Sequence, residues 1–224
     1  MKLIISNHKN DLPKSELNAY LTDISSLNTS HIKLIICPSA EQLPYFKGNN
    51  YSLGSQDIKH NSIKELIDNN VKYTIVGHSY NRKKYGETNE EINKKIKKLL
   101  QNNIIPILCI GEEAKNQTNI DKLLAKQLEE GLKDITEKII IAYEPIWAIN
   151  SGIIPNNDSL KDTINYIKEK SIEITGIEPL IVYGGSVNEK TIITLRKLDL
   201  IDGYLIGKAS LEVNKLKEII EVVK

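Results

Sequence analysis

Residues 139–147 read Ile-Ile-Ile-Ala-Tyr-Glu-Pro-Ile-Trp, a run of apolar and aromatic residues that ends at Glu144 and Pro145. The run does not alternate between apolar and polar positions. Continuous runs of this kind are typical of strands that are buried on both faces, as in a parallel sheet. The segment Ile139–Tyr143 therefore predicts a buried parallel strand that presents a carboxylate at its carboxyl end.

Seven further runs of the same kind recur along the chain. They are Leu3–Ser6, Lys33–Cys37, Ser52–Gly54, Tyr73–Gly77, Ile104–Ile110, Leu180–Tyr183 and Gly203–Gly207. Between them, apolar residues spaced three and four apart predict half-buried helices at Asn89–Asn102, Asn119–Leu132 and Asp158–Ile174. Pro13, Pro44 and Pro155 fall at expected loops or helix starts. Strands therefore alternate with helical segments, as α/β folds require.

Eight strand–helix units in 224 residues fit a compact (β/α)8 barrel, a fold whose size range starts at about 200 residues. The alternative is a doubly wound open sheet, which usually carries a glycine-rich first turn. Residues 6–10, Ser-Asn-His-Lys-Asn, contain no glycine. We find no linker-like or low-complexity tract, so the sequence predicts one barrel domain over residues 1–224.

Composition excludes several classes of function. The 30 Lys and Arg residues nearly balance the 29 Asp and Glu residues, whereas general nucleic-acid or membrane-surface binders need a basic field. Two cysteines, Cys37 and Cys109, are too few for a disulfide framework or a four-cysteine zinc site. They favour a reducing, cytoplasmic location. No apolar run is long enough to predict a membrane span.

Polar residues follow several of the predicted strands, at the end of a barrel where active sites lie. Asn7 and Lys9 follow the first strand, His78 follows the fourth and Glu144 follows the sixth. Glycine-containing turns follow the seventh and eighth strands, and backbone N–H groups in such turns can hold phosphate. Each residue alone has a structural explanation, such as a solvated lysine or a hydrogen-bonded histidine. Their convergence on one mouth favours a catalytic site.

The strand-end motifs resemble those of the triosephosphate isomerase family over nearly the whole chain. The matching segments are Asn7-x-Lys9, Ile75–Ser79, Tyr85–Thr88, Leu108–Glu112, Ala142–Ile149, Tyr183–Val187 and Asp202–Gly207. The segments around Glu144 and after Tyr183 are the most specific. The resemblance implies a TIM barrel that interconverts dihydroxyacetone phosphate and D-glyceraldehyde 3-phosphate through an enediol, a step of glycolysis and gluconeogenesis.

The resemblance also implies roles for the catalytic residues. Glu144 would be the base, and burial in a closed apolar pocket would strengthen it. His78 would donate a hydrogen bond to the substrate carbonyl as neutral imidazole. Lys9 would stabilise the developing oxyanion and attract the phosphate, and Asn7 would add a donor beside it.

A lid, Pro145–Ile154, is implied next, with Pro145 and Trp147 as its first hinge and Gly152 as a flexible point. Ile149 and Leu205 would crowd the base when the lid is shut. The substrate phosphate would rest on backbone N–H groups of Asn150, Ser186, Gly207 and Lys208. The reaction implied needs no metal ion and no organic cofactor.

The chain departs from the family pattern at three single positions. Tyr80 stands where the family has a glutamate that contacts the catalytic lysine, and a phenol cannot neutralise Lys9. Lys208 replaces a glycine but keeps the backbone N–H. Asn150 replaces a lid glycine, and asparagine tolerates left-handed backbone angles better than most residues.

The fourth departure is a shortened loop after the third strand. Ser55-Gln56-Asp57 matches the family, but the loop that follows is roughly nine residues shorter than usual, near an ordinary βα loop length. In the family this loop reaches into the partner subunit, so we expect a monomer or a non-standard oligomer. Two alternatives remain: a non-catalytic or weakly catalytic barrel that binds a phosphorylated ligand or a partner, and an isomerase for another phosphorylated sugar.

Overall fold

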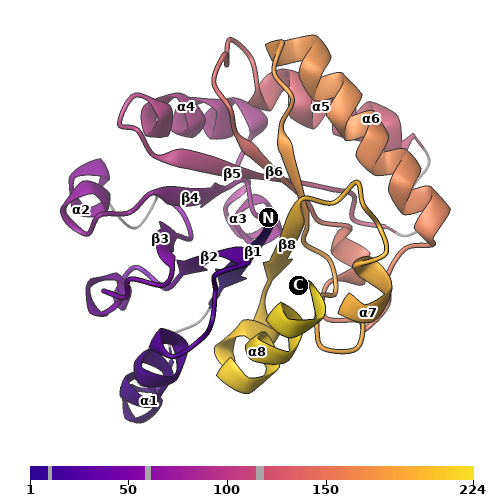
Figure 1. Ribbon diagram of the computed structural model, residues 1–224. Helices are drawn as coiled ribbons and strands as arrows, with labels where there is room; N and C mark the ends of the chain where they lie inside the picture. Colours follow the sequence, from indigo (N-terminus) through magenta and orange to yellow (C-terminus); the bar gives the residue numbers. More distant parts are fainter. Residues whose placement is uncertain (10–11, 59–61, 115–118) are drawn as a thin grey trace.

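The computed structural model describes residues 1–9, 12–58, 62–114 and 119–224. Eight parallel strands form a closed barrel in chain order, and β8 pairs with β1 (Figure 1). The strands are β1 (Lys2–Asn7), β2 (Ile32–Cys37), β3 (Ser52–Ser55), β4 (Tyr73–Val76), β5 (Ile105–Ile110), β6 (Ile140–Tyr143), β7 (Leu180–Tyr183) and β8 (Gly203–Ile206). Each predicted strand is confirmed to within one residue at either end, and the (β/α)8 barrel is confirmed with them.

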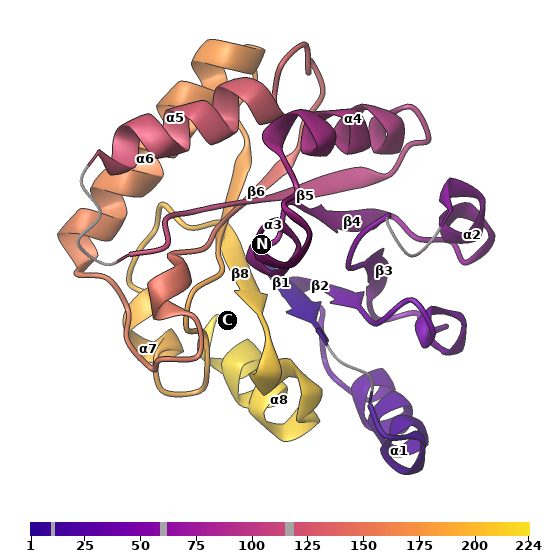
Figure 2. The ribbon, with the colours of Figure 1, turned by 180° about the vertical axis from the view of Figure 1, so that it is seen from behind.

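Helices surround the barrel, as the view from behind also shows (Figure 2). They are α1 (Lys14–Ser25), α2 (Ile63–Asp68), α3 (Ser79–Tyr85), α4 (Asn89–Leu100), α5 (Ile120–Gly131), α6 (Asn157–Thr175), α7 (Ile192–Leu195) and α8 (Val213–Val222). The three predicted helices correspond to α4, α5 and α6. Within the described ranges, no helix is long and apolar enough to cross a bilayer.

The unit between β2 and β3 differs from a regular strand–helix unit. It contains only a short 3-10 helix, η1 (Leu43–Tyr45), with Pro44 near its start. Buried Leu43 and Phe46 cover the barrel at this point in place of a longer helix. The region outside β2 and β3 is therefore thinly covered, which matters for the cavity described below.

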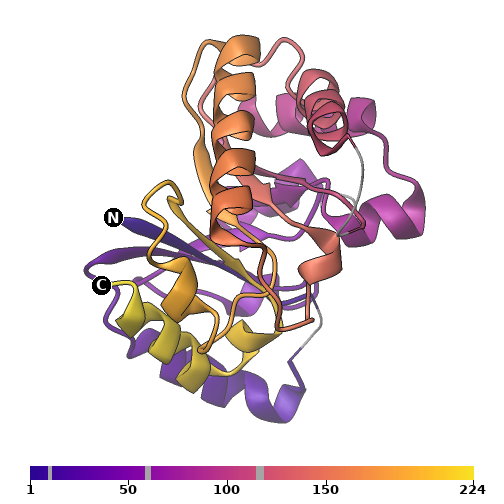
Figure 3. The same cartoon turned by 90° about the vertical axis from the view of Figure 1, so that its right-hand side faces the viewer.

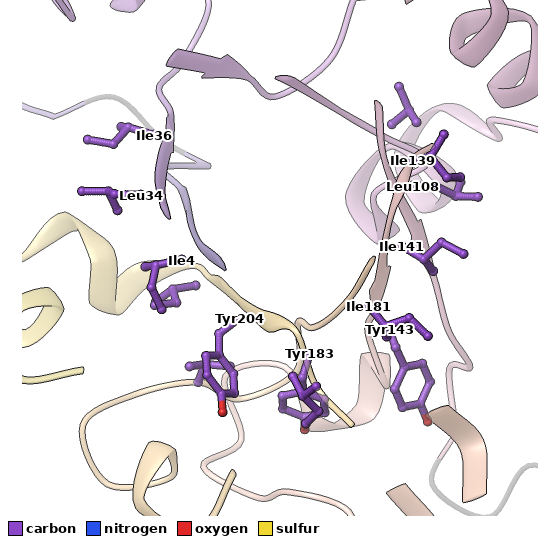
Figure 4. Packing of buried hydrophobic residues seen from close by; sticks show 14 of the residues in the cluster. Ile4, Leu34, Ile36, Leu108, Ile139, Ile141, Tyr143, Ile181, Tyr183 and Tyr204 are labelled. Atoms are coloured by element: carbon purple, nitrogen blue, oxygen red, sulfur yellow. The ribbon is translucent and has the colours of Figure 1, made fainter. Parts of the chain in front are cut away.

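The core has two layers because successive strand residues point to opposite faces of the sheet. Ile5 belongs to the cluster inside the barrel, whereas its neighbour Ile4 packs outside against the helices. Figure 4 shows the outer layer, in which Tyr143, Tyr183 and Tyr204 lie at matching positions on β6, β7 and β8. Burial on both faces is the property that the continuous apolar runs predict. The two chain ends lie side by side (Figure 3), since the first and last strands pair.

His8, which lies between Asn7 and Lys9, is fully buried in an aromatic cluster. Its ring packs edge-on against Tyr20 and Phe46, and its Nε2 lies 2.9 Å from the Tyr20 hydroxyl. That hydroxyl donates its proton to the carbonyl of Ser210, so Nε2 of His8 is the donor to Tyr20. Nδ1 has no hydrogen-bond partner among the described residues. A second proton on this ring would be buried and unpaired, and burial lowers the pKa of His8 to about 4.

We expect this histidine to destabilise the fold in acid. The unfolded chain binds a proton at His8 below a pKa of about 6.5 and the folded chain does not, so stability falls as the pH drops from about 6.5 to about 4. Between pH 7 and pH 4.5 the loss is about 2–3 kcal/mol. Urea unfolding of wild type and His8→Phe at both pH values measures it. Between the two pH values, the free energy of unfolding of His8→Phe should fall by about 2–3 kcal/mol less than that of wild type. An equal fall in the two proteins would contradict the prediction.

Candidate active site

A cavity of about 910 Å³ lies at the carboxyl ends of β1 to β4 and of β6. Asn7 and Lys9 after β1, His78 after β4 and Asn150 after β6 line it, as predicted for site residues. Glu144 adjoins it through His78. The remaining predicted residues, Ser186, Gly207 and Lys208, follow β7 and β8 at the same end of the barrel.

His78 is fixed by the turn between β4 and α3. Gly77 has a φ of +68°, and a Cβ there would lie 2.9 Å from Ile92 and 3.0 Å from Arg82, so only glycine fits this turn. His78 then caps α3, with its Nδ1 accepting a hydrogen bond from the backbone N–H of Tyr80 at 3.2 Å. Because Nδ1 is an acceptor, a neutral ring carries its proton on Nε2. That proton points into the site.

Glu144 and His78 face each other at the centre of the site. Nε2 of His78 and Oε1 of Glu144 are 3.3 Å apart, and both side chains are buried. Neither atom has a hydrogen-bond partner among the described residues. Buried polar atoms are normally paired, and exceptions in native structures are often functional. The pair therefore offers one donor and one acceptor to a bound molecule.

The charge of Glu144 is favoured in this arrangement. Burial raises the pKa of the carboxyl, as expected from sequence. The imidazole of His78, the ammonium of Lys9 and the thiol of Cys109 lower it by more, so the pKa lies below its ordinary value and the expectation that burial strengthens the base is wrong for this state of the site. Glu144 is therefore ionised at neutral pH and ready to accept a proton. Its basicity would rise if a ligand and the lid excluded more water.

Two glycines make room for Glu144. A Cβ on Gly111 would lie only 1.8 Å from the Glu144 carbonyl oxygen. A Cβ on Gly184 would lie 2.9 Å from Cγ of Glu144 and 3.4 Å from Leu205. Gly111 after β5 thus makes room for the backbone of Glu144, and Gly184 after β7 makes room for its side chain, with Leu205 near the same point as expected.

Lys9 reaches toward the predicted phosphate turn. Its backbone has a φ of +37°, unusual for a residue with a side chain, and its N–H donates to Oδ1 of Asn7 at 3.3 Å. Strained backbone of this kind is common at functional sites. The side chain then lies beside Gly207, where a Cβ would be 3.7 Å from Nζ of Lys9. The ammonium therefore lies between the turn after β8 and the cavity.

The segment after β6 is anchored by Glu112 at its start. Pro145 precedes a short 3-10 helix, η2 (Ile146–Ala148). The carboxylate of buried Glu112 accepts hydrogen bonds from Nε1 of Trp147 at 2.8 Å and from the hydroxyl of Tyr143. The backbone carbonyl of Glu112 accepts from the N–H of Ile146 at 2.8 Å. Pro145 and Trp147 thus lie where the predicted hinge requires, and Glu112 holds them.

The far part of this segment contacts the turn after β7. Asn150 has a φ of +57°, which confirms that asparagine adopts the left-handed geometry at this position. The N–H of Gly152, at a φ of +73°, donates to Oγ of Ser186 at 3.1 Å. The segment therefore bridges Glu112 on one side of the mouth and Ser186 on the other.

The Tyr80 side chain contacts its neighbours on α3. Its side chain is 54 % exposed, and its hydroxyl accepts a hydrogen bond from Lys84 at 2.5 Å. The ring packs edge-on against Tyr85, and the Lys84 ammonium lies over both rings. Tyr80 contributes its backbone N–H to His78 rather than a side chain to Lys9.

Sequence reasoning gave no role to three residues that support the site. Arg82 donates to the carbonyls of Gly77 and Cys109, which joins the ends of β4 and β5 beneath His78. The thiol of buried Cys109 favours the charged form of Glu144. Glu112 anchors the segment after β6. Cys109 and Glu112 lie in one motif segment and Arg82 lies between two others, but their roles depend on contacts between elements that sequence spacing does not reveal.

No group of three or more His, Cys, Asp or Glu side chains is arranged to hold a metal ion in the parts of the chain that the structure describes. What the described site offers is a buried carboxylate, an imidazole donor, an ammonium and backbone N–H groups. These are the groups needed to move a proton next to a carbonyl and to hold an anion.

Comparisons with known proteins agree with this chemistry. The family model described as triosephosphate isomerase matches residues 2–223. The triosephosphate isomerase of Clostridium botulinum (strain Langeland) is 36% identical, with 84% of this chain and 85% of the relative covered. That of Endomicrobium trichonymphae is 32% identical over 99% of this chain and 98% of its own length. That of Mycoplasma mobile is 34% identical over 100% and 99%.

Proposed function

This chain belongs to the triosephosphate isomerase family and interconverts phosphorylated trioses, and we propose that Glu144, His78 and Lys9 carry out the reaction. The observation that supports these roles is that Nε2 of His78 and Oε1 of Glu144 face each other in a buried site. Neither atom has a hydrogen-bond partner among the described residues. One atom of the pair can accept a proton and the other can donate a hydrogen bond.

The proposed reaction starts with dihydroxyacetone phosphate. Glu144 removes a proton from the hydroxymethyl carbon next to the carbonyl, and the electron pair of that bond forms the enediol double bond. The proton on Nε2 of His78 and the ammonium of Lys9 stabilise the oxygen that gains charge. The hydroxyl proton on the first carbon then passes by way of His78 to the oxygen of the second carbon. Glu144 returns its proton to the former carbonyl carbon while the first carbon becomes the aldehyde, which gives glyceraldehyde 3-phosphate. Asn7 supplies a further donor next to Lys9.

We also propose the phosphate site and the lid. The backbone N–H groups of Asn150, Ser186, Gly207 and Lys208 hold the phosphate, with the Lys9 ammonium beside Gly207 as support. The segment 145–154 acts as the lid, with Pro145 and Trp147 as its hinge. Its contacts with Glu112 and Ser186 support this role, because both can hold the lid over a bound substrate.

The chain is proposed to act as one domain over residues 1–224, without the family's standard dimer. The segment between β3 and α2 spans only residues 56–62, of which 59–61 lie outside the described residues. A cytoplasmic location is proposed because Cys37 and Cys109 are both unbridged and buried.

The experiment that tests the function follows glyceraldehyde 3-phosphate conversion in a coupled assay over a hundredfold range of protein concentration, on the order of that needed to separate weak dimers. We expect constant specific activity, and a monomer by sedimentation velocity. Specific activity that falls on dilution would show that a second copy completes the site and would contradict the monomer proposal. Absence of turnover at every concentration would favour the non-catalytic barrel, an alternative that no comparison supports.

A further inference from the structure

The cavity is larger than a phosphorylated triose requires. Its volume of about 910 Å³ lies near the top of the range of about 300–1,000 Å³ that holds drug-sized ligands. From Lys9 and His78 it continues past the predicted reaction centre. Its outer walls include Ala40 and Glu41 after β2, Gln56 and Asp57 after β3, and Tyr80 and Tyr85 on α3. Ser186, Gly207 and Lys208 are not among the lining residues.

The topology fixes the direction in which this space extends. In a closed barrel of eight strands in chain order, β2 and β3 lie across the ring from β6 and β7 (Figures 1 and 2). The proposed phosphate turns follow β6, β7 and β8. A substrate whose phosphate rests there, with its carbonyl at His78, therefore directs its other end toward the loops after β2 and β3. In dihydroxyacetone phosphate that end is the hydroxymethyl carbon.

The outer walls are suited to a hydroxylated chain. Glu41 and Gln56 offer carboxylate and amide groups for hydroxyls, and the tyrosine rings offer faces for carbon-bound hydrogens. Asp57 is already engaged, since Lys95 donates to both of its oxygens at 2.7 and 3.0 Å. The Lys95 ammonium neutralises the Asp57 carboxylate and holds it in place, so Asp57 presents no free negative charge to a ligand. Between β2 and β3 the chain forms the short η1 in place of a longer helix.

We propose that the site also accepts ketose 1-phosphates of five or six carbons, as a further activity that rests on the proposed function. Such a molecule is dihydroxyacetone phosphate with its hydroxymethyl carbon extended into a polyol chain. Glu144 removes the proton from the hydroxyl-bearing third carbon, and the electron pair forms a double bond to the carbonyl carbon. Return of a proton to the third carbon regenerates or epimerises the substrate. Return to the second carbon, with transfer of the third-carbon hydroxyl proton to the oxygen of the second carbon, gives the 3-ketose 1-phosphate. No oxidant or reductant is needed.

The test incubates the protein with D-xylulose 1-phosphate in deuterated water and follows loss of the third-carbon proton by NMR. Exchange should exceed that of Glu144→Gln by at least about tenfold. Ala40→Trp and, independently, Glu41→Trp should fill the outer cavity and lower the exchange by about tenfold or more. Triose turnover should stay within about twofold in both. Ala19→Trp, the same change on the exposed face of α1, should alter neither rate.

Exchange no faster than in Glu144→Gln, with triose turnover intact, would overturn this proposal and leave the proposed function standing. If neither tryptophan variant reduces the exchange, the placement of the substrate's polyol chain in this cavity is overturned. Absence of triose turnover in the unmodified protein would overturn both proposals.

Discussion

Glu144→Gln is expected to lower kcat for triose isomerisation by about 10²–10⁴-fold, the contribution of a general base. Glutamine has nearly the same shape and fits the space beside Gly184, but its amide cannot accept a proton from carbon. The carboxylate that it replaces is ionised, because His78, Lys9 and Cys109 lower its pKa despite its burial. The loss should therefore appear in kcat at neutral pH. Steady-state kinetics in the coupled assay measure it.

The same variant should bind phosphate normally. Glu144 lies against His78, whereas the proposed phosphate groups are backbone N–H groups of Asn150 and of the turns after β7 and β8, so the inhibition constant of inorganic phosphate should change by less than about threefold. Glu16→Gln, the same change on the exposed face of α1, is the matched control and should leave kcat unchanged. Turnover of Glu144→Gln within about tenfold of wild type would exclude Glu144 as the base.

Strands and site residues were predictable from sequence for a physical reason. A strand that is buried on both faces has to be apolar along its whole length, so the run ends where the chain reaches the barrel mouth. The first polar residues after such runs, His78 and Glu144 among them, therefore lie at the mouth without any knowledge of contacts. The left-handed backbone at Asn150 followed from the conformational tolerance of asparagine.

Contacts between elements were not predictable in this way. The hydroxyl of Tyr80 could have faced Lys9, and only the packing of α3 shows that it bonds Lys84 instead. Glu112 has no distinctive spacing, and its role depends on Trp147, which is far along the chain. The short η1 after β2 replaced a helix that the repeat of units would suggest. These features arise from tertiary packing, which outweighs local preference.

Gly184→Ala is expected to lower kcat about 100-fold by displacing the base. Its Cβ would lie 2.9 Å from Cγ of Glu144, closer than carbon atoms approach, so the Glu144 side chain has to move. A misplacement of about 1 Å at a reacting group costs about 10²-fold in rate. Leu205, at 3.4 Å from the same Cβ, blocks the alternative of moving the strand end instead. Steady-state kinetics give kcat of the variant, and urea unfolding gives its free energy of unfolding.

The matched control is Gly131→Ala at the end of α5, where the new Cβ would meet only Leu108 at 3.6 Å. Alanine favours helix over glycine by about 1 kcal/mol, so this control should keep full activity and equal or greater stability. In Gly184→Ala the free energy of unfolding should fall by no more than about 1–2 kcal/mol, because a side chain rather than backbone gives way. Activity within about threefold of wild type would mean that the position of Glu144 beside Gly184 is not what the reaction depends on. A large loss of kcat in a protein that remains folded would tie turnover to the sub-ångström placement of one carboxylate, which only a glycine after β7 allows.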